Sequence, residues 1–126
     1  MTMKILIADD ERDIRELIRF TLQFSGYEVI TASNGEEAFE AAYSQQPDLI
    51  LLDVRMPRMT GYEVCIKLKL DEQTKNIPVA FLSAKGQESE VQTGLEAGAD
   101  DYIIKPFSPE QLSERVKVLL GDYRRD

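Results

Sequence analysis

The chain has 126 residues, of which 43% are hydrophobic and 30% are charged, and this size and composition predict one globular domain with a single core. The net charge of −8 opposes nucleic-acid binding, and no apolar run approaches the ~20 residues that a membrane span needs. Histidine is absent, so a histidine-based acid, base or phosphoryl carrier must come from a partner. A single cysteine, Cys65, allows no internal disulfide, and the N-terminus lacks a signal-peptide pattern, so we expect a cytoplasmic protein.

Short apolar runs alternate with longer segments of helical periodicity five times along the chain. Each run is too short for a helix and almost wholly apolar, which is typical of strands in a parallel sheet covered on both faces. The predicted strands are residues 5–8, 29–32, 49–52, 79–82 and 102–104. This order predicts one doubly wound α/β domain over residues 1–121, with a polar tail or linker start at 122–126. Strand order 2-1-3-4-5 is favoured over the alternative 3-2-1-4-5.

Five helices are predicted to cover this sheet. The first has its apolar residues on one face between residues 14 and 22. Asn34 and Thr60 each precede a glutamate by three residues, a capping pattern that starts the second and third helices. Ser108 followed by proline starts the fifth helix, which is predicted to end near residue 120. The fourth helix, predicted over residues 89–97, has only a weak apolar stripe.

Polar and charged side chains follow four of the predicted strands. The first strand ends at Asp9 and Asp10, the third at Asp53, the fourth at Ser83 and the fifth at Lys105. Taken singly, Asp or Ser after a strand is more often a helix cap or turn residue, and a lysine is more often a solvated charge. Asp53 is harder to explain in this way, because it follows the most apolar run and is not needed to start the next helix. Three acids that meet at one sheet edge repel one another, which indicates a compensating cation.

Oxygen ligands without histidine or a nearby cysteine select a hard cation, and we expect Mg²⁺, with calcium as the weaker choice. A spare carboxylate at such a metal can accept a phosphoryl group, because aspartate forms aspartyl phosphates and the metal offsets charge on the phosphoryl oxygens. Lys105 and Ser83 can neutralise and hold those oxygens. Phosphoryl transfer needs mainly positioning and electrostatic stabilisation, which this small set of residues can supply.

Four motifs in chain order, spread over the whole chain, resemble response-regulator receiver domains of two-component signalling systems. They are IADD at 7–10, LDVRMP at 52–57 with Gly61, LSA at 82–84, and GADDYIIKPF at 98–107. Each motif alone is weakly specific, whereas four in order at strand ends are highly specific. The resemblance implies a flavodoxin-like, five-stranded sheet of order 2-1-3-4-5 with five helices, and a cis peptide bond before Pro106.

The resemblance also implies a role for each residue at the strand ends. Asp53 would accept the phosphoryl group, and Asp10, Asp53 and the main-chain carbonyl of Arg55 would ligate Mg²⁺, with Asp9 helping to hold the metal. Lys105 and Ser83 would contact the phosphoryl group, while Ser83 and Tyr102 would switch position and alter the surface formed by the fourth helix, fifth strand and fifth helix. Such a domain is not an enzyme, since it catalyses only its own phosphorylation and dephosphorylation. Arg55 and Lys85 stand at positions that tune self-hydrolysis in the family.

The expected partners follow from the same resemblance. The resemblance implies a sensor histidine kinase or phosphotransfer protein as the donor, which fits the lack of histidine here, and a downstream output domain or protein. We expect no direct nucleic-acid or membrane binding. Receivers attached to winged-helix domains dimerise through ion pairs, and Asp101 and Arg115 remain from that pattern, whereas Val91, Ala97 and Gln111 are uncharged. We therefore expect a monomer or weak dimer.

Three other classes of protein share some of these features. A haloacid-dehalogenase-like phosphatase needs an acid two residues after its nucleophile, where this chain has Arg55. An FMN carrier needs a glycine- and hydroxyl-rich loop after the first strand, where this chain has three acids from Asp9 to Glu11. A receiver-like interaction module that never takes a phosphoryl group remains open.

Overall fold

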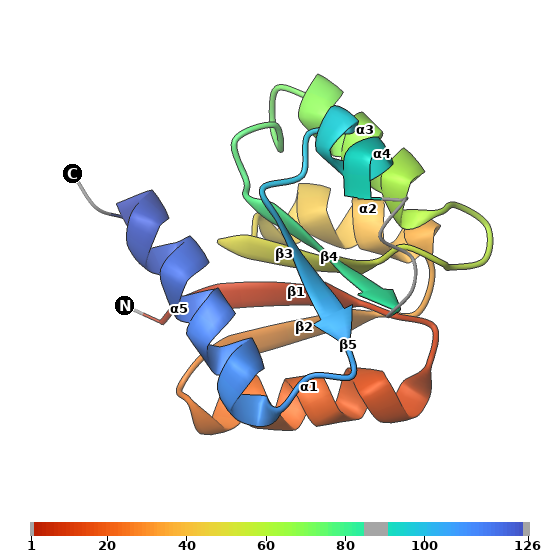
Figure 1. Cartoon of the computed structure of the whole chain (residues 1–126). Helices are drawn as coiled ribbons and strands as arrows, with labels where there is room; N and C mark the ends of the chain where they lie inside the picture. The colour runs from red at the N-terminus through yellow and green to blue at the C-terminus, as the bar shows by residue number, and fades with distance from the viewer. Residues whose placement is uncertain (1, 85–90, 125–126) are drawn as a thin grey trace.

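The computed structural model describes residues 2–84 and 91–124, and its centre is a five-stranded parallel sheet (Figure 1). The strands are β1 (Lys4–Ala8), β2 (Glu28–Ala32), β3 (Leu49–Asp53), β4 (Val79–Ala84) and β5 (Asp101–Lys105). They are ordered β2-β1-β3-β4-β5. The predicted order 2-1-3-4-5 is therefore confirmed, and the alternative 3-2-1-4-5 is excluded.

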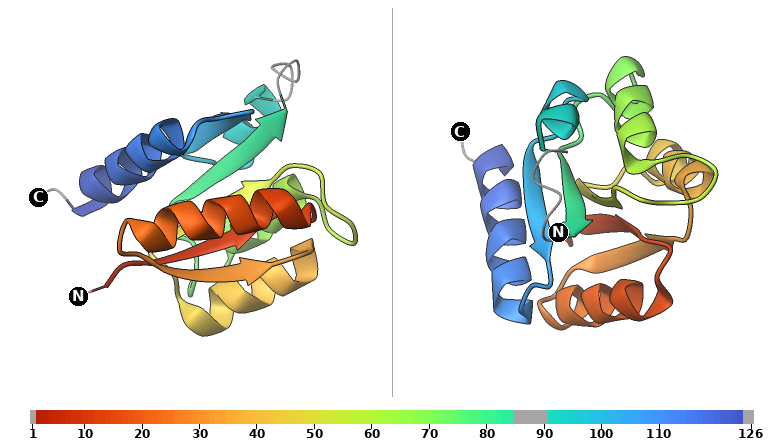
Figure 2. Two further views of the ribbon diagram at one scale, coloured as in Figure 1. Left: turned by 90° about the horizontal axis from the view of Figure 1, so that it is seen from below. Right: turned by 45° about the vertical axis from the view of Figure 1, so that its right-hand side comes forward.

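Helices cover both faces of the sheet (Figure 2). They are α1 (Arg12–Phe24), α2 (Gly35–Gln45), α3 (Gly61–Leu70), α4 (Val91–Glu96) and α5 (Pro109–Arg124). α1 and α5 pack on one face, and α2 and α3 pack on the other together with Ala97, which follows α4. None of the helices in the described ranges is long and apolar enough to cross a membrane.

The apolar runs bury alternate side chains against opposite helical layers. In β3, Leu49 and Leu51 belong to the core under α1 and α5, whereas Ile50 and Leu52 belong to the core under α2 and α3. All five residues of β3 are buried. This two-sided burial explains why the strand is apolar at every position instead of alternating with polar residues.

Side-chain caps begin three of the helices, as the sequence predicts. Asn34 accepts a hydrogen bond from the Glu37 N–H (3.0 Å), and Thr60 and Glu63 form a reciprocal capping box. Ser108 forms the equivalent pair of bonds with Gln111. α5 continues to Arg124, beyond the predicted end near residue 120.

The region around α4 corrects one detail of the sequence interpretation. Residues 89 and 90 of the predicted helix lie outside the described residues, and the described helix ends at Glu96. Ala97 follows the helix and is only 8% exposed. Ala97 is therefore nearly buried as well as uncharged, and its place in the charge pattern of the family's dimers stays a prediction.

Candidate functional site

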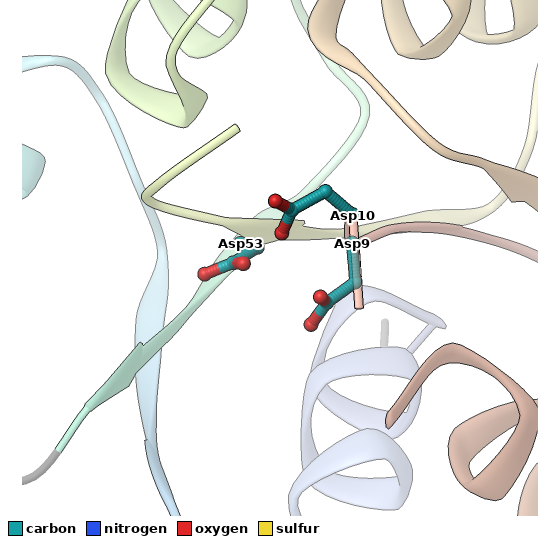
Figure 3. A group of neighbouring side chains, drawn as sticks. All are labelled: Asp9, Asp10 and Asp53. Carbon is teal, nitrogen blue, oxygen red and sulfur yellow. The ribbon is translucent and has the colours of Figure 1, made fainter. Parts of the chain in front are cut away.

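Three carboxylates meet at the carboxyl edge of the sheet, where β1 and β3 end (Figure 3). One oxygen from each of Asp9, Asp10 and Asp53 lies within 4.8 Å of the others. The parallel pairing of β1 with β3 explains this meeting, because it places the ends of the two strands side by side. Asp9 is fully buried, Asp53 is 5% exposed and Asp10 is exposed. The cluster thus has two buried acids and one acid open to solvent.

Asp9 has one satisfied and one unsatisfied carboxylate oxygen. Its Oδ1 accepts a hydrogen bond from the Glu11 N–H (2.9 Å), and its main-chain carbonyl accepts one from Arg15 Nη1 (2.8 Å). Its Oδ2 is buried and accepts no hydrogen bond from the part of the chain that the structure describes, although Lys105 Nζ lies 3.5 Å away. A buried carboxylate oxygen without a hydrogen bond is costly, so further positive charge near this atom would be favourable.

Lys105 brings an ammonium group into the acidic cluster from the end of β5. Its Nζ lies 3.5 Å from an oxygen of each of three carboxylates, those of Asp9, Glu11 and Asp53. The peptide bond between Lys105 and Pro106 is cis, as expected. The sequence interpretation gave Glu11 no role at this site. The sequence signal that could have identified Glu11 is its place as the third consecutive acid after a strand.

The electrostatics of the site favour added positive charge. Burial, and then repulsion from Asp9, raise the pKa of Asp53 from 3.8 to about 7. Burial also raises the pKa of Asp9 above its ordinary value. Burial works against the charge on Lys105, but Asp53, Asp9 and Glu11 together outweigh it and raise the pKa of the ammonium. One lysine therefore faces more negative charge than it can balance.

Two close backbone contacts hold the β3–α3 loop that follows Asp53. A Cβ on Gly61 would lie 2.3 Å from the Asp53 main-chain oxygen, and a Cβ on Gly35 would lie 2.2 Å from that of Met59. Only glycine permits these approaches. The start of α3 therefore packs directly against the beginning of the loop, and the start of α2 packs against its end. Within the loop, the Arg55 N–H donates a long hydrogen bond (3.4 Å) to Asp53 Oδ1.

A cavity opens between Asp10 and this loop. Its volume is about 660 Å³, and its lining includes Asp10, Arg55, Pro57 and Tyr62. The exposed carboxylate of the cluster is therefore reachable from solvent through a space large enough for hydrated ions and small phosphorylated groups.

Ser83 lies near the end of β4, the neighbour of β3, and Tyr102 lies near the start of β5. Ser83, 1% exposed, comes one residue after Leu82, which pairs with Asp53 in the sheet. Tyr102 belongs to the core under α2 and α3, whereas the next residue, Ile103, belongs to the opposite core. By the two-residue alternation of strands, Ser83 shares a sheet face with Phe81 and Tyr102. Lys85, the other residue expected near the site, lies outside the described residues.

The donor set fits a hard divalent cation. The acidic cluster offers carboxylate oxygens, the chain has no histidine, and its single cysteine, Cys65, is buried within α3. Mg²⁺ prefers a few carboxylates together with water, which matches two buried acids and one acid facing solvent. Fold and geometry together define a class of protein: a doubly wound α/β domain with an acidic site at its carboxyl edge that is suited to a cation.

The chain belongs to the response regulator receiver domain family, whose model matches residues 5–117. It is 49% identical over 120 residues to the alkaline phosphatase synthesis transcriptional regulatory protein PhoP of Bacillus subtilis, covering 95% of this chain and 49% of that protein. The chain thus spans about half the length of the curated relatives that it matches.

Solved structures agree with this family assignment. A putative response regulator from Chloroflexus aurantiacus has a TM-score of 0.92 and 39% identity, covering 96% of this chain and 99% of that one. The receiver domain of a sensor histidine kinase from Pseudomonas aeruginosa has a TM-score of 0.89 and 28% identity, covering 96% and 99% of the two chains. That second structure has a magnesium ion coordinated in its active-site cleft.

Proposed function

We propose that this domain receives a phosphoryl group on Asp53 from the phosphohistidine of a sensor kinase or phosphotransfer protein, in a reaction that depends on Mg²⁺. The observation that carries the proposal is the position of the Asp53 carboxylate, between two further acids and the ammonium of Lys105. A structural role alone does not account for this cluster, because the acids repel one another and one buried oxygen has no hydrogen bond.

In the proposed reaction, an oxygen of Asp53 forms a bond to phosphorus while the phosphorus–nitrogen bond of the donor histidine breaks. The electron pair of that bond stays with the departing imidazole. Asp53 must be ionised to attack, and the nearby ammonium of Lys105 favours its ionised form. Lys105 and Ser83 then hold the phosphoryl oxygens.

The cation site in this proposal consists of Asp10, Asp53 and the main-chain carbonyl of Arg55, with Asp9 supporting it. The three carboxylates supply oxygens within 4.8 Å of one another, and the buried Oδ2 of Asp9 accepts no hydrogen bond from the described residues, which supports a cation at this place. A bound Mg²⁺ would offset negative charge on the phosphoryl group and on the carboxylates. Without it, a phosphoryl group would add charge to a cluster that is already short of cations.

The proposed output is a conformational change passed through Ser83 and Tyr102 to the surface of α4, β5 and α5. A cytoplasmic location belongs to the proposal. The relative from Bacillus subtilis is a transcriptional regulator about twice as long as the matched region. We propose that the acidic receiver itself does not bind nucleic acid, since its net charge is −8.

Intact-mass measurement after incubation with acetyl phosphate and Mg²⁺ tests the proposal. We expect one added phosphoryl group on the parent chain, none on Asp53→Asn, and none when EDTA replaces Mg²⁺. Asp13→Asn is the matched control, because Asp13 is exposed in the first turn of α1 and should not affect the reaction. An unmodified parent chain under these conditions and with a phosphorylated histidine donor would favour an interaction module that takes no phosphoryl group.

A further inference from the structure

Tyr102 lies inward in the structure, beneath α4. Its side chain is at the end of a column of three aromatic rings that starts at α3. Tyr62 packs edge-on against Phe81 with ring centroids 5.1 Å apart, and Phe81 packs against Tyr102 at 5.4 Å. Phe81 is fully buried and Tyr102 is 9% exposed. The ring of Tyr102 is therefore supported from one side by a neighbour that cannot move without disturbing the core.

Gly94 of α4 supplies the space on the other side of the ring. A Cβ built on Gly94 would lie 1.9 Å from the Tyr102 hydroxyl oxygen, 2.6 Å from Cζ and 2.8 Å from Cε2. These three atoms form the rigid end of the phenol, so the overlap cannot be relieved by bending a flexible chain end. The inward ring of Tyr102 therefore occupies the space that the Cβ of any residue other than glycine at position 94 would need.

The backbone at Gly94 is held in place by several hydrogen bonds. The Gly94 carbonyl accepts bonds from the N–H groups of Ala97 and Ala99, both at 3.1 Å. The Ala97 carbonyl accepts a bond from the Cys65 thiol of α3 (3.3 Å). A methyl group at position 94 would therefore meet a fixed helix end on one side and a ring supported by Phe81 on the other. Rotation of Tyr102 outward would relieve the overlap without moving either support.

We infer that Gly94 is a positioning residue that permits the inward orientation of Tyr102, and that its replacement by alanine turns the ring outward whatever the state of Asp53. This inference rests on the proposed function, in which phosphorylation acts through Tyr102. Glycine is the least favourable residue of a helix interior after proline, so its place in a helix as short as α4 needs a local reason. The contact with Tyr102 provides that reason.

Fluorine NMR of protein labelled with 3-fluorotyrosine tests the orientation of the ring. Tyr102→Phe assigns the Tyr102 resonance, and spectra are recorded with and without beryllofluoride and Mg²⁺. In Gly94→Ala we expect this resonance at a solvent-exposed shift that no longer responds to beryllofluoride. Gly121→Ala is the control, because a Cβ on Gly121, which also lies in a helix, meets nothing within 4 Å. A Gly94→Ala spectrum identical to that of the parent would overturn the inference.

A double-mutant cycle in thermal unfolding keeps the test decisive if Gly94→Ala is unstable. The substitution should lower the melting temperature of the parent, yet leave unchanged or raise that of Tyr102→Ala, where the ring is gone. An equal loss in both backgrounds would mean that Gly94 serves another purpose and would refute the inference.

Phosphorylation separates this inference from the proposed function. Gly94→Ala should reach the same final yield of phosphorylated Asp53 as the parent. If the parent takes no phosphoryl group, the proposed function fails, while the metal-free spectra and the unfolding cycle still decide the role of Gly94. If the parent is phosphorylated but a folded Gly94→Ala variant is not, the substitution acts on the reaction at Asp53, and the inference is refuted.

Discussion

The Asp53 carboxyl is expected to make the metal-free protein less stable at pH 8 than at pH 5. Burial and repulsion from Asp9 raise its pKa from 3.8 to about 7 in the folded state. The folded protein therefore retains a proton at a pH where the unfolded chain has released it. The stability supplied by this proton is fully present below the unfolded pKa of 3.8 and is lost as the pH rises through about 7.

The size of the effect follows from the two pH units between pH 5 and the folded pKa of about 7. Each unit corresponds to about 1.4 kcal/mol, so the upper value is about 3 kcal/mol. Attraction between ionised Asp53 and Lys105 is already part of that pKa, and solvent relaxation reduces the effect further. We expect Asp53→Asn to stabilise the metal-free protein by roughly 1 to 2 kcal/mol at pH 8 and by much less at pH 5.

Urea unfolding in EDTA at the two pH values measures this difference directly. Asp13→Asn on the exposed surface of α1 serves as the control for loss of one negative charge. Lys105 keeps two carboxylate neighbours, Asp9 and Glu11, when Asp53 is neutralised, so the variant should not leave an unpaired buried ammonium. Two results would refute this reasoning. One is an Asp53→Asn variant with a lower free energy of unfolding than the parent at pH 8, and the other is a change in that free energy that is equal at both pH values.

Three further predictions concern the metal, the lifetime and the assembly state. Tenfold excess over an assumed millimolar dissociation constant for Mg²⁺ should add about 1.4 kcal/mol of stability. Asp10→Asn should abolish that increment and stabilise the metal-free protein, and a melting curve that still responds to Mg²⁺ would contradict the site. Arg55→Ala should shorten the lifetime of phosphorylated Asp53 in a decay assay, because a long side chain there screens the group from water; an unchanged or longer lifetime would oppose this. With beryllofluoride and Mg²⁺, sedimentation should show no dimer of micromolar or tighter affinity, since Arg115 already pairs with Asp101 within the chain and Gln111 is uncharged.

The fold was predictable because its local signals agree with its tertiary packing. β3 is apolar at each position from Leu49 to Leu52 and is buried on both faces, so run length and composition were sufficient to identify it. Asn34 and Thr60 are helix caps in the sequence and in the structure. α4 gave a weaker signal, because Gly94 in its interior interrupts the apolar stripe to make room for another side chain.

The site was predictable only in part, because sequence shows which strand ends meet but not which atoms do. Asp9, Asp53 and Lys105 were expected at one edge, and they lie there together. Glu11 was overlooked, since an acid just before a helix is commonly a solvated charge and its distance to Lys105 depends on the turn after β1. The sequence also does not show that a Cβ at position 94 would overlap Tyr102, because the two residues lie eight positions apart on different elements.

β5 connects the charged site with the proposed switch through its side-chain alternation. Lys105 at its end reaches the acidic cluster, while Tyr102 near its start points into the opposite core under α2 and α3. Both residues belong to one short strand that pairs with β4, where Ser83 lies opposite Ile104. A phosphoryl group that draws Lys105 and Ser83 toward Asp53 would therefore act on two neighbouring strands at once. Because Tyr102 packs between Phe81 and Gly94, a small shift of these strands would change the fit of its ring. In the proposed switch, this is the route by which a charge added at the acidic cluster would alter the surface of α4, β5 and α5.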